Sequence, residues 1–352
     1  MGANNEKALS YDDVLLLPQY SEVESRGDIS LSTNLGKGLQ LSMPIFSSPM
    51  DTISESRMGV AMQRAGGAAV IHRYNSIEEQ SRIINITKSL TQEDHRHDLM
   101  IGAAVGVTGD YIERAQMLRS QFVKFICVDV AHGHHILMKR ALSNLRAHLG
   151  DDVHIMAGNV ATLDGINDLA DWGANSVRCN IGGGSICSTR VQTGHGVPGL
   201  QTILNCAQTD RDVKIIADGG IRTAGDVVKA LAAGAGADAV MCGSLLSGTL
   251  ETPGKVFEDI DGSKWKSYRG MASKEAQVEW HGRYSSFEGV STRVPFRGEV
   301  GHILADLERG IRSGFSYSGV STLEELHIRA KFITQTSSGM TESRPHIINR
   351  RW

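Results

Sequence analysis

The 352-residue sequence has little of several features that mark particular protein classes. Aromatic residues make up only 5% of it, and no window approaches the roughly 18 apolar residues that a membrane span needs. The 36 Lys and Arg residues nearly balance the 39 Asp and Glu residues, so the net charge is -3. This balance predicts no general affinity for nucleic acid or for membranes. Any anion-binding site must therefore be local.

Cysteine is also scarce, and its pattern excludes a disulfide framework. The five cysteines include no C-x-x-C pair, and their odd number is unsuited to complete pairing. Cys127, Cys179 and Cys242 lie within apolar runs, which predicts small buried core residues. Near the N-terminus no basic flank precedes a long apolar run, as it would in a signal peptide. We therefore expect reduced thiols and a cytoplasmic protein.

Eight short apolar segments recur along the chain and predict buried strands. They lie at 44–48, 68–72, 101–105, 124–129, 153–158, 175–179, 213–218 and 238–243. The segments between them have helical spacing, and several open on Ser or Thr and close on Gly, as capped helices do. Such alternation indicates a parallel sheet covered on both faces. Eight units predict an α/β fold of the (β/α)8 TIM barrel type, with a doubly wound open sheet as the alternative.

Polar or glycine residues follow nearly every predicted strand. The active site of a barrel is built at the carboxyl ends of its strands. The residues at these ends are Ser48, Met50 and Asp51, then His72 and Arg73, Asp129 and His132, Asn159, the loop 182–190, Asp218 to Gly220, and Gly243 with Ser244. We therefore expect one pocket at this end of the barrel.

Two glycine turns in this set predict a phosphate site. Gly219 and Gly220 precede a predicted helix near Thr223, and Gly243 and Ser244 precede a second predicted helix. Glycine lets backbone N–H groups approach an anion, and a helix N-terminus adds partial positive charge. The alternative is a pair of ordinary tight turns. Their position in adjacent units, with Ser185 nearby in the predicted barrel, favours phosphate.

Cys187 stands in the glycine-rich loop "GGGSICSTR" (182–190) and has three possible interpretations. It is a small buried hydrophobe, a metal ligand together with "HGHH" (132–135), or a nucleophile activated by nearby cationic groups or helix dipoles. The metal interpretation is weak, because no compact ligand set has a familiar zinc spacing.

Several long motifs, in order along the chain, resemble the IMP dehydrogenase/GMP reductase family. They are "LSYDDVLLLP", "SSPMDT", "VGVTGD", "DVAHGH", "AGNVAT", "GGGSICSTR", "ADGGIRTAGDVVKALAAGA", "GSLLSGTLETPG" and "YRGMAS". The resemblance runs from about residue 8 to 346. It implies a (β/α)8 barrel, assembled as a homotetramer, that acts on a purine 5′-monophosphate with a nicotinamide cofactor.

The resemblance also assigns roles to individual residues. Cys187 matches the nucleophile that attacks C2 of the purine, and Thr189 matches a residue that assists proton transfer. Glu288 matches a residue near the base, and we predict that it helps Thr189 to protonate the departing amine. The substrate-binding positions are matched by Ser48, Met50, Ser185, Asp218, Gly219, Gly220, Gly243, Ser244, Tyr268, Gly270, Met271, Ala272 and Glu288. The cofactor-binding positions are matched by Asp129, Val130, Ala131, Asn159, Arg178 and Tyr284.

The same loop resembles a cation site of the family. Gly182, Gly184 and Cys187 match positions whose backbone carbonyls hold a monovalent cation, K⁺, in the dehydrogenases. A neighbouring subunit's C-terminal segment completes that site, and "TESRPH" near the end of this chain resembles it.

Three features favour the reductase branch of the family. No CBS modules are inserted after the second strand, the segment between Gly270 and Val294 is short, and "TRVQTGHG" resembles a reductase pattern. We therefore predict a GMP reductase that uses NADPH to convert GMP to IMP and ammonia. A CBS-less IMP dehydrogenase that uses NAD is the alternative, and a non-catalytic nucleotide-binding relative is a remote one.

Some motifs favour the dehydrogenases instead. "SSPMDT", "GSLLSGTLETPG" and "ESRPH" are of the dehydrogenase type, and Arg73 replaces a lysine that is common in reductases. Within one predicted domain, 1–352, we expect residues 270–298 to form a flap-like insertion and residues 335–352 to form a C-terminal tail.

Overall fold

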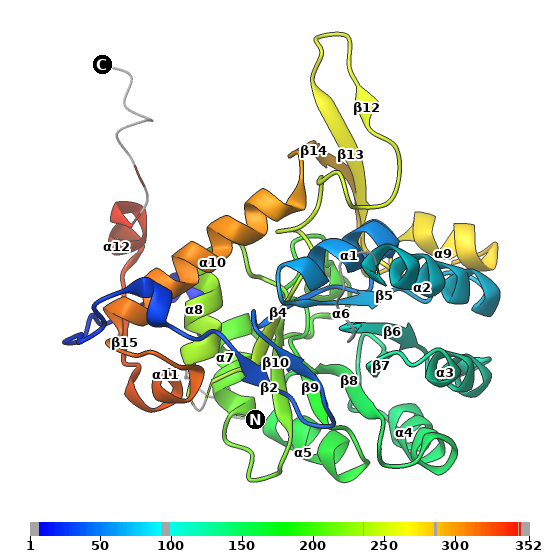
Figure 1. Cartoon of the computed structure of the whole chain (residues 1–352), viewed down its shortest axis with the longest axis horizontal. Coiled ribbons are helices and arrows are strands. Elements are labelled where there is room, and N and C mark those ends of the chain that lie inside the picture. Colours follow the sequence, from blue (N-terminus) through cyan, green and yellow to red (C-terminus); the bar gives the residue numbers. More distant parts are fainter. Residues whose placement is uncertain (1–6, 93–98, 235, 285–286, 344, 346–352) are drawn as a thin grey trace.

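The structure is a computed structural model, and it describes residues 7–92, 99–234, 236–284, 287–343 and 345. Its centre is a closed barrel of eight parallel strands, arranged in chain order from β4 to β11, which pairs back with β4 (Figure 1). The barrel strands are β4 (Ile45–Ser47), β5 (Ala68–Ile71), β6 (Ile101–Val105), β7 (Phe125–Asp129), β8 (His154–Val160), β9 (Ser176–Cys179), β10 (Lys214–Asp218) and β11 (Ala239–Cys242). Closure confirms the predicted TIM barrel, and the alternative of an open sheet is wrong.

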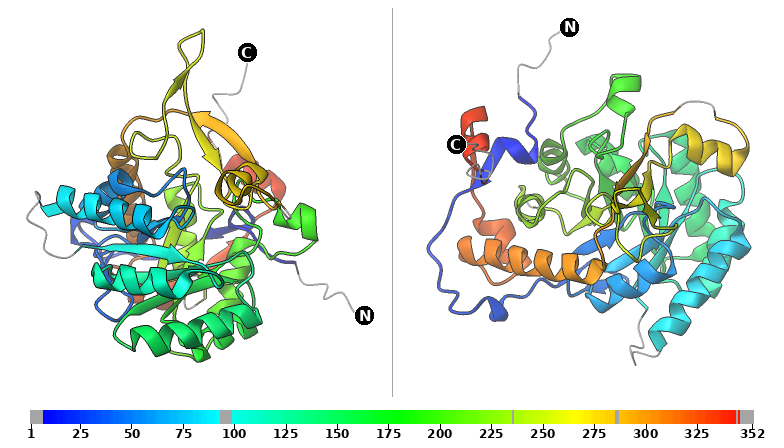
Figure 2. Two further views of the ribbon diagram at one scale, coloured as in Figure 1. Left: turned by 90° about the vertical axis from the view of Figure 1, so that its right-hand side faces the viewer. Right: turned by 90° about the horizontal axis from the view of Figure 1, so that it is seen from above.

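Helices surround the barrel and shield its strands from solvent (Figures 1 and 2). Most begin after a Ser, Thr or His whose side chain accepts a hydrogen bond from the first helical turn; Thr162 and Thr223 are examples. The helices are α1 (Ser56–Arg64), α2 (Ile77–Gln92), α3 (Tyr111–Ser120), α4 (Ile136–Leu149), α5 (Leu163–Asp171), α6 (Thr189–Thr193), α7 (Gly199–Cys206), α8 (Ala224–Ala232), α9 (Lys274–His281), α10 (Val300–Tyr317), α11 (Leu323–Arg329) and α12 (Ser337–Glu342).

Two hydrophobic cores hold these layers together. The larger one lies between the barrel and its helices, and the smaller one fills the barrel interior with side chains that include Phe46 and Phe125. Their rings meet edge to face, with centroids 5.5 Å apart. Gly102 in β6 leaves room for this packing, because a Cβ there would lie 2.3 Å from the Phe125 ring. The short hairpin of β2 (Thr33–Asn34) and β3 (Gln40–Leu41) adds Leu35, Leu39 and Leu41 to the interior core.

Three smaller features lie outside the barrel. The N-terminal and C-terminal parts of the chain come together where β1 (Val14–Leu16) pairs antiparallel with β15 (Phe332–Thr334). Strands β12 (Phe257–Glu258), β13 (Lys264–Arg269) and β14 (Ser291–Pro295) form a sheet whose hairpin projects from the barrel in Figure 1. Two 3-10 turns, η1 (Tyr11–Asp13) and η2 (Arg26–Asp28), lie in the N-terminal segment.

Two expectations about local structure can be judged directly. Cys127, Cys179 and Cys242 are buried free thiols, as predicted. The helix predicted after Gly243 and Ser244 is wrong, because residues 244–250 form consecutive turns. Within these turns the Ser247 hydroxyl donates to the Ser244 carbonyl, and Gly248 has a positive φ of 75°. Among the described helices, none is long and apolar enough to cross a membrane.

Candidate active site

A cavity of about 350 Å³ opens at the carboxyl ends of the barrel strands. It is lined by every residue to which the family resemblance assigned a role, except Tyr284. Of the polar residues expected at the strand ends, Asp51, His72 and His132 do not line it. Arg73, Tyr74, Asn180 and Ile186 line it as well. Parallel strands of a barrel end at one rim, and this brings together residues that are far apart in the chain.

Cys187 heads a short chain of hydrogen-bonding side chains at the cavity. The exposed Cys187 thiol donates to the Thr189 hydroxyl, with 3.1 Å between Sγ and Oγ1. That hydroxyl in turn donates to Oε2 of Glu288 over 2.8 Å. The three groups predicted to be catalytic are therefore connected, and a proton can pass from the thiol to the carboxylate through one hydroxyl.

Backbone hydrogen bonds fix the Cys187 loop to the segment that carries Glu288. The Ser188 N–H donates to the Glu288 carbonyl (2.8 Å), and the Val290 N–H donates to the Ile186 carbonyl (3.0 Å). The Glu288 N–H donates to Ala272, which also lines the cavity. These bonds on both sides of Glu288 hold its carboxylate beside Thr189.

The predicted phosphate corner combines two glycine turns with three hydroxyl groups. Gly219 and Gly220 have positive φ values of 82° and 75°, which glycine adopts readily. They precede α8, whose N-terminus adds partial positive charge. Burial raises the pKa of Tyr268, whereas hydrogen bonds with Ser185 and Ser244 oppose this shift. The corner thus offers hydroxyl and backbone donors. Of the two helix N-termini predicted there, the described residues form one, that of α8.

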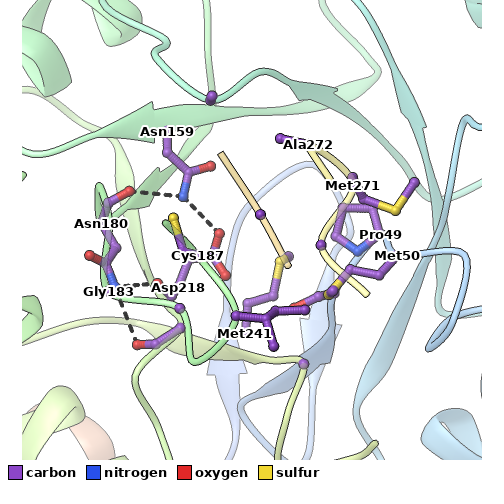
Figure 3. Close-up of a pocket in the computed structure, with 18 of the residues that line it drawn as sticks. Pro49, Met50, Asn159, Asn180, Gly183, Cys187, Asp218, Met241, Met271 and Ala272 are labelled. Carbon is purple, nitrogen blue, oxygen red and sulfur yellow. Dashed lines mark hydrogen bonds between the residues drawn. The ribbon is translucent and has the colours of Figure 1, made fainter. Parts of the chain in front are cut away.

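A largely buried ion network lies next to this corner and begins at Asp218, which directly precedes Gly219. Arg178 donates to Oδ1 of Asp129 over 2.6 Å and to Oδ2 of Asp218 over 2.8 Å. Asn159 donates a further bond of 2.8 Å to Oδ2 of Asp218 (Figure 3). The Asp218 Oδ1 atom receives no hydrogen bond from the described residues, so it can accept one from a ligand.

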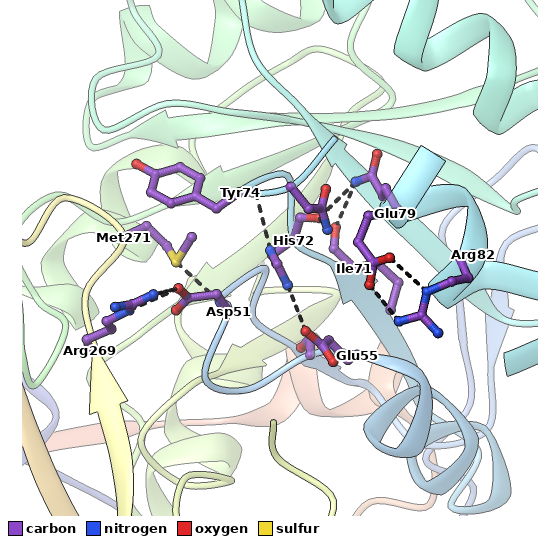
Figure 4. A network of polar contacts seen from close by, with 12 residues as sticks. Asp51, Glu55, Ile71, His72, Tyr74, Glu79, Arg82, Arg269 and Met271 are labelled. Atoms are coloured by element: carbon purple, nitrogen blue, oxygen red, sulfur yellow. Dashed lines mark hydrogen bonds and ion pairs between the residues drawn. The ribbon is translucent and has the colours of Figure 1, made fainter. Parts of the chain in front are cut away.

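The segment between Met271 and Glu288 packs against the barrel rim through α9. The ring of Trp280 stacks on Tyr74, with centroids 4.1 Å apart, and the Arg73 guanidinium lies over the Trp280 ring. Arg269 connects Asp51 with Glu279 of α9 by ion pairs; Figure 4 shows its contact with Asp51. Helix α9 is therefore held by an aromatic stack and by a charge pair.

Arg283 and Tyr284 lie beyond the end of α9 and do not line the cavity. Tyr284 is 46% exposed, and its ring contacts the Lys274 ammonium at 4.7 Å. Tyr284 was predicted to contact the cofactor, but it is not among the residues that line the cavity. The pair follows Gly282, the C-cap of α9, where a positive φ of 70° ends the helix.

Gly182, Gly184 and Cys187, the positions predicted to hold a monovalent cation, would do so through their backbone carbonyl oxygens. Carbonyl oxygens suit a hard cation. Gly182 has a positive φ of 81°, and the Gly184 carbonyl accepts the Cys187 N–H over 3.1 Å. Residues 344 and 346–352, which belong to the predicted C-terminal tail, lie outside the described residues. The cation site therefore stays a prediction.

Sequence reasoning missed some residues of the rim. Asn180 donates to the backbone carbonyl of Asp218 over 2.7 Å and so supports the glycine turn. The sequence feature that could have identified Asn180 is its polar amide, which directly follows the predicted strand at 175–179. Trp280 gave no signal, because its partner Tyr74 is about 200 residues away in the chain.

A family model described as the IMP dehydrogenase/GMP reductase domain matches residues 8–346. The chain belongs to this family. Inosine-5′-monophosphate dehydrogenase from Cryptosporidium parvum is 36% identical to it, with 98% of this chain and 97% of the relative covered. A GMP reductase from Leishmania major is 31% identical, with 98% of each chain covered. The family consists of oxidoreductases that act on purine monophosphates and use nicotinamide nucleotides.

A solved structure of a family member matches nearly the whole fold. It is a cysteine-to-alanine variant of GMP reductase from Trypanosoma brucei in complex with guanosine 5′-monophosphate. The TM-score is 0.90 at 30% sequence identity, and 97% of this chain and 98% of that chain are covered. The barrel is therefore the fold of the family.

The lengths of the relatives bear on the prediction that the absence of inserted CBS modules favours a reductase over a dehydrogenase. The alignment with the Leishmania GMP reductase is 483 residues long, whereas that with the Cryptosporidium dehydrogenase is 395 residues long. The former relative thus carries more than a hundred residues that this chain lacks. Absence of a long insertion does not distinguish a reductase from a dehydrogenase in this family.

Proposed function

We propose that this protein is a GMP reductase, which converts GMP to IMP and ammonia with NADPH. The observation that carries the proposal is the chain from Cys187 through Thr189 to Glu288, with separations of 3.1 and 2.8 Å. Loss of ammonia from C2 needs a nucleophile and a proton donor on the same side of the purine. This chain provides both.

The proton of the Cys187 thiol can be followed in this scheme to the ammonia that leaves. The Cys187 thiol passes its proton through the Thr189 hydroxyl to Glu288, and the thiolate attacks C2 of GMP. Glu288 then returns the proton through Thr189 to the 2-amino group, which leaves as ammonia. The purine is now joined to Sγ through C2. When bound, the reduced nicotinamide supplies the hydride that C2 needs to become the C–H of IMP. The thiolate departs from C2 and takes up one proton from solvent, which restores the thiol.

Binding is divided between the two sides of the cavity. Ser185, Ser244 and Tyr268 would hold the phosphate with the turn at Gly220, and Oδ1 of Asp218 would accept from the ribose. Ser48, Met50, Met271 and the backbone of Gly270 and Ala272 would enclose the base. Asp129, Val130, Ala131 and Asn159 would contact the dinucleotide; a polar and a small apolar lining is compatible with its ribose and nicotinamide.

Water must be kept from the covalent purine, since hydrolysis would give XMP instead of IMP. In the dehydrogenases that the sequence resembles, an Arg-Tyr pair on a long flap activates that water. Here Arg283 and Tyr284 do not line the cavity, and only a few residues separate them from Glu288. This arrangement supports the reductase.

The proposal extends to the assembly and its surroundings. We infer a homotetramer in the cytoplasm, without a nucleic-acid or membrane partner, and a K⁺ ion at Gly182, Gly184 and Cys187. These inferences depend on the family resemblance of "GGGSIC" and "TESRPH". A CBS-less IMP dehydrogenase that uses NAD is the second candidate, and the 36% identical dehydrogenase from Cryptosporidium parvum favours it.

Two parallel assays separate the candidates. The protein is incubated with GMP plus NADPH and, separately, with IMP plus NAD⁺, and the absorbance of the reduced cofactor is followed. We expect oxidation of NADPH and formation of IMP in the first assay alone. Formation of XMP and NADH in the second assay would establish the dehydrogenase. The Cys187→Ala variant serves as the control for both, because neither reaction proceeds without the nucleophile.

A further inference from the structure

The Arg178 side chain is almost entirely engaged by the protein. The residue is 6% exposed, and its Nε and Nη2 atoms donate to Oδ2 of Asp218 over 3.1 and 2.8 Å. Its Nη1 atom donates to Oδ1 of Asp129 over 2.6 Å and contacts the Cys127 sulfur at 3.5 Å. A guanidinium has five N–H donors. These contacts use four of them, which leaves little for a bound cofactor.

The two carboxylates that share Arg178 belong to different parts of the proposed site. Asp218 ends β10 and faces the proposed ribose, whereas Asp129 ends β7 and lies beside Val130 and Ala131 on the proposed dinucleotide side. Their side chains are only 12% and 18% exposed. Two negative charges at such depth repel each other unless a cation lies between them.

The geometry also leaves each carboxylate with one oxygen for a ligand. Oδ2 of Asp218 accepts three bonds, two from Arg178 and one from Asn159, and this saturation fixes the plane of the carboxylate. Asp129 presents Oδ1 to Arg178, and its Oδ2 lies 3.8 Å from Nε of Arg73. That Nε atom is buried and has no hydrogen-bond partner among the described residues. Arg73 therefore balances charge but does not replace Arg178 as a forked donor.

We infer that Arg178 is a positioning residue that orients Asp218 for the ribose and Asp129 for the dinucleotide through one shared guanidinium. Arg178 thus acts on both ligands without contacting either, in contrast to the direct cofactor contact predicted from the sequence. The inference rests on the proposed purine 5′-monophosphate site, and it holds for a reductase and for a dehydrogenase alike.

The test measures how strongly the protein prefers GMP over analogues that lack a ribose hydroxyl. A general loss of structure would weaken the binding of all these nucleotides and would not remove the preference alone. Dissociation constants of GMP, 2′-deoxy-GMP and 3′-deoxy-GMP are measured by calorimetry with the full-length protein, together with that of NADPH or NADH, whichever binds more tightly. The wild type is expected to prefer GMP over at least one deoxy analogue by about tenfold or more, because a hydrogen bond to a carboxylate is lost. In Arg178→Gln this preference falls to within about threefold, and dinucleotide binding weakens by about tenfold as well.

Three variants sharpen the result. Asp218→Asn should remove ribose discrimination and leave dinucleotide binding intact, whereas Asp129→Asn should do the reverse. Arg114→Gln is the matched control, since Arg114 is also buried and paired with an aspartate but lies away from the cavity. Its ribose discrimination should equal that of the wild type.

Arg178→Lys keeps the test decisive if Arg178→Gln does not fold. An ammonium is a point charge that reaches one carboxylate well, so one of the two affinities should recover and the other should not. Full ribose discrimination in Arg178→Gln, or loss of dinucleotide affinity alone, would overturn the inference. So would full recovery of both affinities in Arg178→Lys. If the wild type binds neither GMP nor IMP, the proposed function itself fails.

Discussion

The wall of the pocket formed by the barrel strands differs from the outer wall, which belongs to residues 270–284 and 287–290, in how firmly the side chains are held. On the barrel wall, the buried Arg178 donates hydrogen bonds to Asp218 of the neighbouring strand, whose side chain is largely buried. On the segment that carries the outer wall, Tyr284 and Phe287 lie outside the cavity lining and are nearly half exposed, and α9 is held mainly by Trp280 and Glu279.

This difference separates two tasks. The barrel wall carries groups suited to binding a nucleotide, a requirement shared by the dehydrogenases and reductases of the family. The outer wall carries Glu288, and its segment also holds the Arg-Tyr pair outside the cavity; in our proposal the fate of the covalent purine depends on this arrangement. In our proposal, recognition therefore resides in the strand ends, whereas the choice of reaction resides in one segment outside the barrel.

The largest effect is expected from the one nucleophile that both reactions need. Cys187→Ala should lower turnover by roughly four orders of magnitude or more, because the covalent step is lost. Affinity for the nucleotide should stay within a few-fold, since the barrel wall supplies its contacts. Steady-state assays and calorimetry check the two statements, and near-normal turnover would refute the role of the thiol.

The next effect concerns the outer wall. Glu288→Gln should lower GMP reduction by about 100-fold or more, because the carboxylate no longer takes and returns the proton. Release of ammonia in a single turnover is the measurement. Glu275→Gln, on the same segment but bonded to Ser291 at the surface, should react at the wild-type rate. Equal rates for Glu288→Gln and wild type would remove Glu288 from the mechanism.

A third prediction tests the stability of the barrel and not its chemistry. Burial lowers the pKa of His154, at the start of β8, to about 4 from an ordinary value of 6.5. The unfolded chain therefore binds a proton between these values that the folded barrel excludes. As the pH falls from about 6.5 to 4, the free energy of unfolding should decrease by about 3 kcal/mol on this account.

Denaturant titrations across that pH range provide the test for His154. His154→Asn should show a shallower dependence of unfolding free energy on pH, whereas a substitution at the exposed His148 should keep the wild-type slope. An unchanged slope in His154→Asn would show that other groups govern acid unfolding.

The smallest effect is expected from the exposed Arg283. Arg283→Ala should change the rate of GMP reduction by no more than about fivefold, as for an exposed charge outside the cavity. Rates for Arg283→Ala and Glu288→Gln are measured side by side. A larger loss for Arg283→Ala, with XMP formed from IMP by the wild type, would reverse the comparison between the two walls and assign the outer one to hydrolysis.

Much of this architecture could be predicted from local patterns. All eight barrel strands follow from short apolar runs, and the residues after them converge because parallel strands share one rim. The turns at 244–250 were mistaken for a helix, since Leu245 and Leu246 beside Ser244 suggest helical spacing although Gly248 does not. The shared role of Arg178 was out of reach, because its partners lie 40 and 49 positions away and no periodicity connects them.

The closure of the barrel has a consequence for how the chain acquires its fold. Strand β4 pairs with β11, which is synthesised nearly 200 residues later. Until then one edge of β4 has no partner, and such edges favour association with other chains. Contacts of this separation also slow folding, since a long loop must close before they form. The nascent protein therefore passes through a stage, ending with Cys242, in which every other strand pair of the barrel can exist while the ring is still open.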